Sequence, residues 1–190
     1  MIERGRDKFR KFKPMLNILS SFFRIFPSKL RKKLLVHYRM KKGNIGIALR
    51  YSVLKTLCKH LGDNVSIHEG VYIFEPQNLC LGNNVSIHPM CYIDATGGIE
   101  VGNDVSIAHG VTIMSTSHNF HSKDIPIKDQ GVKKSKVVIN HNVWLGAKAT
   151  ILCGISIGAG AVIGANSVVT HPVEENTINV GAPSKAIKER

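Results

Sequence analysis

One heptapeptide recurs three times at intervals of 20 residues, and this repeat constrains the fold more than any other feature of the chain. The copies are Leu61-Gly-Asp-Asn-Val-Ser-Ile67, Leu81-Gly-Asn-Asn-Val-Ser-Ile87 and Val101-Gly-Asn-Asp-Val-Ser-Ile107. Within and beyond them an aliphatic residue returns every six positions, and a small or β-branched residue usually follows it four positions later. A period of six suits neither an amphipathic helix nor a long strand. The aliphatic positions are Leu61, Ile67, Ile73, Leu81, Ile87, Ile93, Val101, Ile107, Ile113, Ile139, Leu145, Ile151, Ile157, Ile163 and Val169.

Short strands joined by tight turns account for this period. Each strand places one large and one small side chain inward, and Gly or Asn serves the corners that need a positive φ. Three such segments close a triangular coil of about 18 residues, so the observed spacing adds residues at one corner, near Glu75 to Asn78 and near Ala95 to Gly98. About five coils are expected to stack into a prism whose interior is filled by the aliphatic ladder.

The repeat lapses between Ile113 and Ile139, and the interrupted stretch predicts a loop over residues 117–136. This segment carries His118, His121, Asp124 and a cluster of lysines. Long excursions from a regular scaffold usually carry function, which favours a site here over a plain surface insertion.

Composition and charge limit the possible functions. Hydrophobic residues make up 43% and charged residues 21% of the 190 residues, which is typical of one globular domain with at most a small appendage. The net charge of +13 is uneven: residues 1–60 hold 17 Lys and Arg against Glu3 and Asp7, whereas residues 61–190 are close to neutral. The apolar run from Met15 to Phe26 is too short to span a bilayer, and no cleavage site follows it, so we expect a cytoplasmic protein.

The basic residues 1–60 predict helices broken at Pro14, Pro27 and Gly43-Asn44. Residues 44–60 suit a cap over the open edge of the first coil. Residues 1–42 carry more charge than a cap needs and are typical of a segment that contacts an anionic membrane surface, here at the inner face. Nucleic acid is the other partner that such charge suggests, but no binding motif accompanies it. Five phenylalanines interleave with the charges: Phe9, Phe12, Phe22, Phe23 and Phe26.

The hexads, the interrupting loop, the segment Val137-Val-Ile-Asn-His-Asn-Val-Trp-Leu-Gly-Ala147 and the ending Gly181-Ala-Pro-Ser-Lys185 together resemble the hexapeptide-repeat acyltransferases. The nearest branches are galactoside and maltose O-acetyltransferases and acetyltransferases of capsule and exopolysaccharide synthesis. The resemblance implies a left-handed parallel β-helix over residues 61–180, assembled as a homotrimer with active sites between subunits. Residues 181–190 are expected to form a short C-terminal tail helix.

The resemblance also implies a reaction, in which an acetyl group passes from acetyl-CoA to a saccharide hydroxyl. A base near neutral pH must take the hydroxyl proton, and histidine suits this role. His118 occupies the family's catalytic position and is predicted to act as the general base in a direct transfer. The developing oxyanion needs a fixed donor, and the resemblance points to the backbone N–H of Ala147 beside Gly146.

The coenzyme is expected to lie in a groove lined by small corner residues and ending in cations, because phosphates attract point charges. Trp144, the only tryptophan, is expected to line the wall beside the thioester. An ordinary packing or solvent-exposed role is the alternative for the tryptophan and for the lysines. The predicted cofactor-binding set is Trp144, Gly146, Ala147, Gly164, Ala165, Thr170, His171, Lys185 and Lys188.

The acceptor side departs from the family pattern. Met90 stands where the sugar acetyltransferases carry Asn, and an apolar side chain cannot orient a hydroxyl. Asp94 is a candidate replacement, and Asn119 and His121 are candidates for acceptor contact. N-acetylation of an amino sugar, serine O-acetylation and a β-helical scaffold without turnover remain alternatives.

Histidines at equivalent places on neighbouring coils, His68, His88 and His109, raise the possibility of a metal site. The β-helical γ-class carbonic anhydrases bind zinc on this scaffold through His-x4-His and a third histidine, whereas this loop holds His118-x2-His121. No metal is therefore predicted, and a surface stack of histidines is expected.

Overall fold

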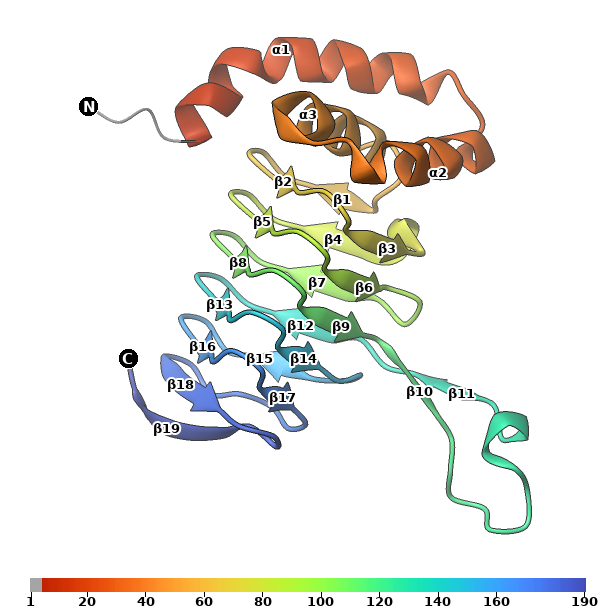
Figure 1. The fold of residues 1–190 in the computed structure, drawn as a ribbon, viewed down its shortest axis with the longest axis vertical. Coiled ribbons are helices and arrows are strands. Elements are labelled where there is room, and N and C mark those ends of the chain that lie inside the picture. Colours follow the sequence, from red (N-terminus) through yellow and green to blue (C-terminus); the bar gives the residue numbers. More distant parts are fainter. Residues whose placement is uncertain (1–4) are drawn as a thin grey trace.

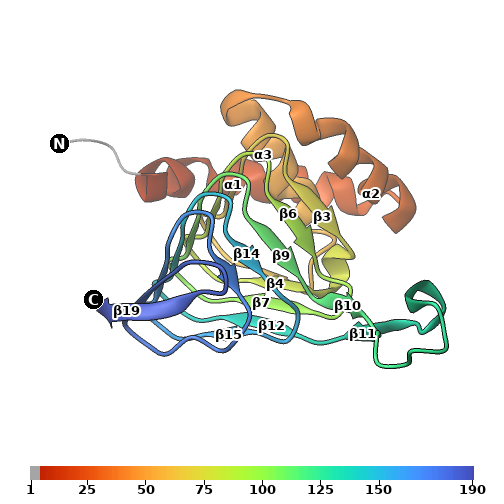
Figure 2. The ribbon, with the colours of Figure 1, turned by 60° about the horizontal axis from the view of Figure 1, so that its bottom comes forward.

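The chain forms a left-handed parallel β-helix, with three helices at its N-terminal end (Figure 1). The computed structural model describes residues 5–190. Three sheets form the faces of a triangular prism, which Figure 2 shows obliquely along its axis. The helical elements are α1 (Gly5–Arg24), α2 (Ser28–His37), the 3-10 helix η1 (Tyr38–Met40) and α3 (Gly43–Leu54).

Each coil contributes one short strand to each sheet, and nearly all neighbouring strands are parallel. Sheet A contains β1 (His60–Leu61), β4 (Leu79–Leu81), β7 (Ile99–Val101), β12 (Val137–Ile139) and β15 (Ser156–Ile157). Sheet B contains β2 (Ser66–Ile67), β5 (Ser86–Ile87), β8 (Ser106–Ile107), β13 (Trp144–Leu145), β16 (Val162–Ile163), β18 (Thr177–Val180) and β19 (Lys185–Glu189). Sheet C contains β3 (Tyr72–Phe74), β6 (Tyr92–Asp94), β9 (Thr112–Met114), β14 (Thr150–Ile151) and β17 (Val168–Val169).

The aliphatic ladder fills the prism as predicted. Strand register stacks equivalent positions directly, as for Ile87 between Ile67 and Ile107. All predicted ladder positions are buried except Ile73, which is half-buried because it borders a cleft beneath α2. The small partners are also buried, from Val65 to Ser167. Burial of this row supplies the main driving force for folding, at about 1.5–3 kcal/mol for each large aliphatic side chain.

The corners use the residues that the sequence predicted. Between sheets A and B, Asn64, Asn84 and Asp104 adopt φ values of 54°, 57° and 58°. Their side chains form a ladder, with the Nδ2 of Asn64 donating to Oδ1 of Asn84 at 3.1 Å and that of Asn84 donating to Oδ1 of Asp104 at 3.0 Å. Asn and Asp tolerate the left-handed region better than other non-Gly residues. Between sheets C and A, the predicted extra residues form the 3-10 helix η2 (Pro76–Asn78) and the turn at Gly98.

The helices lie over the first coil, where residues 44–60 are expected to form a cap. Tyr51 and Leu54 of α3 are buried in the same core as the ladder, and the Tyr51 hydroxyl donates to the carbonyl of Gly62 at 3.2 Å. The predicted break at Pro14 is wrong, since α1 runs through this residue. Proline removes one hydrogen bond, but Leu16 and Phe23 are buried after it and Phe9 packs on Tyr51 before it, which holds both halves on α3.

The predicted tail helix is also wrong. Residues 185–189 form the strand β19, which pairs antiparallel with β18 from Val180↔Lys185 to Thr177↔Glu189. The last coil leaves β18 with an open edge, and the unpaired backbone groups of that edge are satisfied by a strand and not by a helix. Within residues 5–190 no helix is both long enough and apolar enough to cross a bilayer.

Candidate active site

The interrupting segment is a β-hairpin that leaves the corner between sheets C and A, here called the C–A corner (Figures 1 and 2). Its strands are β10 (Thr116–His118) and β11 (Val132–Lys134), and the 3-10 helix η3 (Ile127–Asp129) lies in the loop between them. His118 is the last residue of β10, pairs with Val132 and exposes its side chain. The histidine is thus held by a paired backbone and not by a free loop.

A buried polar cluster anchors the base of the hairpin. The Ser115 hydroxyl donates to the carbonyl of Asp94 at 2.6 Å and accepts from the N–H of Gly97 at 2.7 Å. The Asp94 carboxylate accepts from the Thr116 hydroxyl at 2.7 Å and from the backbone and hydroxyl of Thr96. Burial opposes the charge, but these hydrogen bonds prevail and lower the pKa of Asp94. Asp94, predicted as an acceptor ligand, therefore braces the strand that carries His118.

The outer part of the hairpin is held by amide side chains. The backbone N–H of Asn119 donates to the carbonyl of Gly131 at 3.1 Å, and its Nδ2 donates to the carbonyl of Gln130 at 3.0 Å. The side-chain amide of Gln130 in turn accepts from the N–H of Ser122 at 3.0 Å and donates to the carbonyl of Ser122 at 2.9 Å. Asn119 thus closes the loop, whereas the His121 ring contacts only Phe120 among the rings of the described residues, at 5.2 Å. Sequence reasoning missed Ser115, Thr116 and Gln130, because polar residues inside a gap in the repeat carry no periodic signal.

The second group of predicted residues lies at the corner between sheets B and C, here called the B–C corner. Gly146 and Gly164 are equivalent positions on successive coils, each followed by an alanine, and Ala165 is exposed. A Cβ on Gly146 would lie 2.6 Å from the backbone nitrogen of Ala165, so the two coils approach as closely as backbones allow. Gly146, Ala147, Gly164 and Ala165 thus form a strip of small residues across two coils, here called the ledge, which the exposed Lys148 and Asn166 border.

Trp144 and the Ala147 N–H border this ledge. Trp144 points outward from sheet B between Ser106 and Val162, and 54% of its side chain is exposed. The carbonyl of Ala147 accepts from the N–H of Asn166 at 2.9 Å, while its own N–H donates to no backbone acceptor within the described chain. Met90 lies at the same corner two coils away, in the left-handed region at φ 63° and exposed. The ledge therefore combines an aromatic wall, small residues and an available donor.

The remaining predicted coenzyme residues are dispersed. Thr170 and His171 lie at the C–A corner of the fifth coil, where the Thr170 hydroxyl and Nδ1 of His171 are 2.7 Å apart. Lys185 and Lys188 lie on the exposed outer strand β19, and Lys185 is near the B–C corner because it pairs with Val180. The structure thus brings one of these cations to the end of the ledge.

The two groups of predicted site residues do not meet within one chain. The strands of sheet C run from the B–C corner to the C–A corner. Ala147 precedes β14 at the B–C corner, whereas the hairpin with His118 follows the neighbouring strand β9 at the C–A corner, so the length of a strand separates them. Figure 2 shows the hairpin projecting from its corner away from the prism. His118, Asn119, His121 and Asp94 therefore gather at one end of sheet C, and Trp144, Gly146, Ala147, Gly164 and Ala165 at the other.

Two of the three histidines on neighbouring coils, His68 and His88, stack on one another. The rings of His68 and His88 lie 5.0 Å apart at an interplanar angle of 13°. Burial, and then the neighbouring His88, lower the pKa of His68. Among residues 5–190 no three His, Cys, Asp or Glu side chains are grouped as a metal would require.

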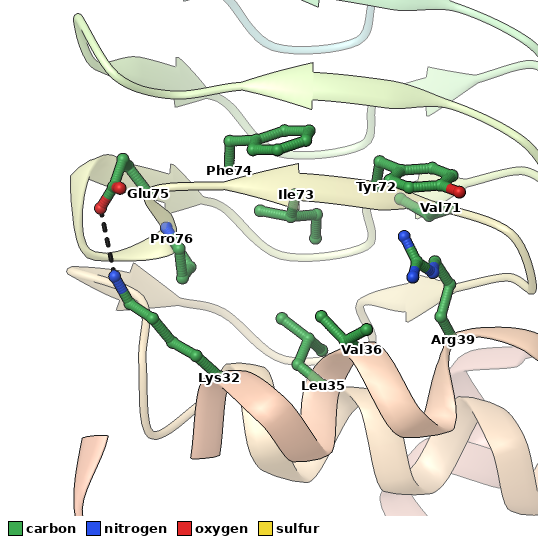
Figure 3. Close-up of a pocket in the computed structure, with 10 residues that line it drawn as sticks. All are labelled: Lys32, Leu35, Val36, Arg39, Val71, Tyr72, Ile73, Phe74, Glu75 and Pro76. Carbon is green, nitrogen blue, oxygen red and sulfur yellow. Dashed lines mark hydrogen bonds and ion pairs between the residues drawn. The ribbon is translucent and has the colours of Figure 1, made fainter. Parts of the chain in front are cut away.

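Two clefts lie at the N-terminal end of the described chain. A cleft of about 330 Å³ separates α2 from β3, with Leu35 and Val36 facing Ile73 (Figure 3). Arg39 stacks on the Tyr72 ring at 3.8 Å, and Lys32 binds Glu75 at 3.1 Å, at the two ends of the cleft. None of its residues belongs to either half of the predicted site. A site whose halves lie at two corners forms no enclosed cavity in one chain.

The fold and the repeat define the protein as a hexapeptide-repeat β-helix. Residues 136–171 match the family model described as the hexapeptide repeat of succinyl-transferase. The galactoside O-acetyltransferase of Escherichia coli K12 is 29% identical over 162 residues, which cover 85% of this chain and 78% of that protein. A putative lipopolysaccharide biosynthesis O-acetyl transferase of the same organism is 47% identical over 68 residues, which cover 36% of this chain and 35% of its own length.

Solved structures agree with these matches. A maltose O-acetyltransferase from Clostridium difficile has a TM-score of 0.73 at 28% identity, with 85% of this chain and 84% of that chain covered. A galactoside acetyltransferase in complex with coenzyme A shares the fold at a TM-score of 0.76 and 23% identity, with 99% and 92% covered. In both sequence and fold the chain is therefore similar to hexapeptide-repeat acetyltransferases. The chain spans only 26% and 35% of the length of two of the curated relatives it matches.

Proposed function

We propose that this protein is an acetyltransferase that moves an acetyl group from acetyl-CoA to a saccharide hydroxyl. The observation that carries the proposal is the pair of half-sites: a histidine on a braced hairpin at the C–A corner, and a small-residue ledge with a backbone donor at the B–C corner. Relatives with this fold are named as galactoside and maltose O-acetyltransferases, and one was solved with coenzyme A.

The ledge suits a long, thin co-substrate. A pantetheine arm needs a path without protruding side chains, which Gly146, Gly164 and Ala165 offer beside the Trp144 ring. Lys185 and Lys188 supply point charges for the phosphates at the exposed end. The Ala147 N–H would then stabilise the oxyanion that develops on the thioester carbonyl.

The imidazole of His118 would act as the general base. As the acceptor oxygen attacks the thioester carbonyl carbon, the ring nitrogen takes the hydroxyl proton, and the tetrahedral intermediate collapses by releasing the thiolate, which is protonated by the imidazolium. No acyl-enzyme forms. Asp94 and Thr116 would position the imidazole, because their hydrogen bond fixes the strand that carries His118.

The separation of the half-sites supports assembly as a homotrimer. Neither half can complete the reaction alone, and a rotation axis parallel to the prism would bring the hairpin of one copy beside the ledge of the next. The active site would then be built from two chains. We further propose that the protein works in the cytoplasm.

The acceptor class rests on the named relatives and on polar residues near the hairpin. Met90 replaces a polar residue of the sugar acetyltransferases, so the acceptor must be held by other groups, and His121 is exposed for this role. Amino-sugar N-acetylation needs the same half-sites, as does serine O-acetylation. A scaffold without turnover is the non-enzyme alternative.

Substitution of the base tests the proposal. Thiol release from acetyl-CoA, measured with a panel of mono- and oligosaccharide acceptors, is expected to fall by about 10²–10⁴ in His118→Ala, because a positioned acid–base group contributes that much. Lys123→Ala, at an exposed position of the same loop to which no role is assigned, provides the control, and its turnover should stay close to that of the unsubstituted protein. Turnover of His118→Ala within about tenfold of the unsubstituted protein would refute the assignment.

A further inference from the structure

Helix α1 carries a second apolar face that the fold does not use. Its inner face, with Leu16, Ser20 and Phe23, is buried against the cap. On the outer side lie Met15, Ile18 and Phe22, and Ile25 follows in the turn that directly continues the helix, where its N–H donates to the carbonyl of Phe22 at 3.2 Å. Their spacings of three, four and three residues place them on one stripe. Their exposed fractions are 52%, 72%, 52% and 76%. We call these four residues the α1 stripe.

Cations accompany the α1 stripe. Lys11 lies one helical turn before Met15 and Lys8 two turns before it, while Lys29 follows at the other end. In the described part of the chain none of these three lysines forms an ion pair. Over residues 5–60 there are 16 Lys and Arg and one acidic residue, Asp7. The surface around the stripe is therefore both apolar and strongly positive.

The apolar surface continues into a cleft. Phe12 and Met15 border a space of about 410 Å³ between α1 and α3, whose other walls include Phe9, Ile45 and Ala48. Ile45 is itself 67% exposed at the rim. Together the stripe and the cleft form one contiguous apolar area at the N-terminal end of the prism, where Figure 1 shows α1 as the outermost element. Contiguous areas of this kind mark binding sites.

The charge decides between the candidate occupants. A second copy of this face would bring two strongly positive surfaces together, which opposes pairing. Nucleic acid would satisfy the lysines but would leave the four aliphatic and aromatic side chains in water. A bilayer with anionic lipids satisfies both, because headgroups meet the lysines while the apolar side chains enter the acyl boundary.

We propose that the α1 stripe attaches the protein to an anionic lipid surface, with the α1 axis lying in the plane of the membrane. The residues that the structure leaves available for this contact differ from those that the sequence suggested. Of the five phenylalanines near the N-terminus, Phe23 is buried, Phe9 packs on Tyr51 and Phe26 packs against the cap. Phe22, the aliphatic residues beside it and Phe12 at the adjoining cleft therefore carry the contact. The attachment does not depend on the reaction proposed above.

Vesicle flotation of the full-length protein tests this attachment. We expect the protein to float with vesicles of phosphatidylcholine mixed with phosphatidylglycerol, and to float less with phosphatidylcholine alone or at raised salt. Ile18→Gln combined with Ile25→Gln should lower the partition coefficient at least about tenfold, because two exposed aliphatic side chains no longer enter the bilayer. Ile187→Gln, at an aliphatic position that is 59% exposed on β19 at the opposite end, is the control and should float normally.

The outcomes separate the possibilities. Circular dichroism and acetyl-CoA turnover with a soluble acceptor should be unchanged in the double variant, so loss of flotation with intact turnover supports the attachment independently of the enzyme assignment. Equal flotation of the double variant and the unsubstituted protein overturns the proposal, as does a change in oligomeric state caused by the double substitution without any vesicle binding. Retention on a DNA column without flotation would likewise overturn it.

Discussion

At the scale of single residues, the fold depends on where a side chain is absent. Gly146 does not need an unusual φ; it needs the absence of a Cβ, because the backbone of the next coil lies directly against it. The sequence predicted this position as a small corner residue, and the structure shows that its smallness also holds the coils together. The same residue therefore serves packing and, in the proposed function, the path of the co-substrate.

Gly146→Ala is expected to destabilise the protein by about 3 kcal/mol, because the new Cβ would meet backbone atoms at 2.6–2.7 Å that cannot turn away. Thermal unfolding should show a lower Tm by about 5 °C or more. Gly164→Ala is the matched control, since its Cβ would meet the movable side chain of Val180 at 2.7 Å, and its shift should be clearly smaller. Equal shifts in the two variants would contradict the role of backbone contact.

Residue-scale prediction succeeded where position in the repeat decides burial and was incomplete where polar contacts decide it. The ladder from Leu61 to Val169 is buried almost throughout because periodicity alone directs side chains inward. Asp94 was expected to face an acceptor, yet Thr96 and Thr116 bind its carboxylate. No periodic signal reports such partners, because Thr96 lies in the irregular corner directly after Asp94 and Thr116 lies on β10, outside the repeat.

At the scale of elements, a buried arginine joins the helical cap to the first coil. Arg50 on α3 is 1% exposed, and its Nε donates to the carbonyl of Ile67 at 2.9 Å. Its Nη1 donates to the carbonyls of Tyr38 and Lys41 at 2.9 and 2.6 Å. One guanidinium thus ties α3 to η1 and to β2, which a single-point ammonium cannot do.

Arg50→Lys is expected to lower the free energy of unfolding by about 3 kcal/mol, because carbonyls that accept from the guanidinium lose their donor in a buried place. Denaturation followed by far-ultraviolet circular dichroism measures the loss. Arg24→Lys, at an exposed position on α1, should change the free energy by no more than about 0.5 kcal/mol. A loss of the same small size in Arg50→Lys would show that the cap is held by apolar contacts alone.

The two elements that were predicted wrongly share one cause. The tail was predicted as a helix, and α1 was predicted to break at Pro14. In each case a tertiary contact outweighs local preference: the open edge of β18 takes β19 as its partner, and the inner face of α1 packs on α3 on both sides of the proline. Local propensity is a weak guide wherever an edge or a core face awaits a partner.

At the scale of the whole molecule, the proposed active site requires more than one chain. His118 belongs to the C–A corner and the ledge at Gly146 belongs to the B–C corner, so a chain that lacks one half could still lend the other half to a neighbour. This arrangement permits a direct test of assembly.

Mixed trimers should recover activity from two inactive parents. His118→Ala removes the base, and Ala165→Glu places a charge on the exposed ledge against the phosphates of the co-substrate. If the two are co-expressed in equal amounts, about a quarter of the interfaces would pair an intact hairpin with an intact ledge, so about a quarter of the unsubstituted activity should return. Sedimentation equilibrium should give a mass of three chains. A monomeric mass, or a mixture as inactive as its parents, would contradict the shared site.

By itself the sequence determined the coil, the corner residues, the excursion at residues 117–136 and the position of His118 within it, because a six-residue period leaves a chain few other ways to bury its aliphatic residues. Only the tertiary structure decided which residues brace the hairpin, that β19 seals the last coil, that the two half-sites stand at opposite ends of sheet C, and that Met15, Ile18, Phe22 and Ile25 remain uncovered. The physical reason is that burial follows local periodicity, whereas hydrogen-bond partners, strand edges and exposed faces depend on which distant segments come together in space.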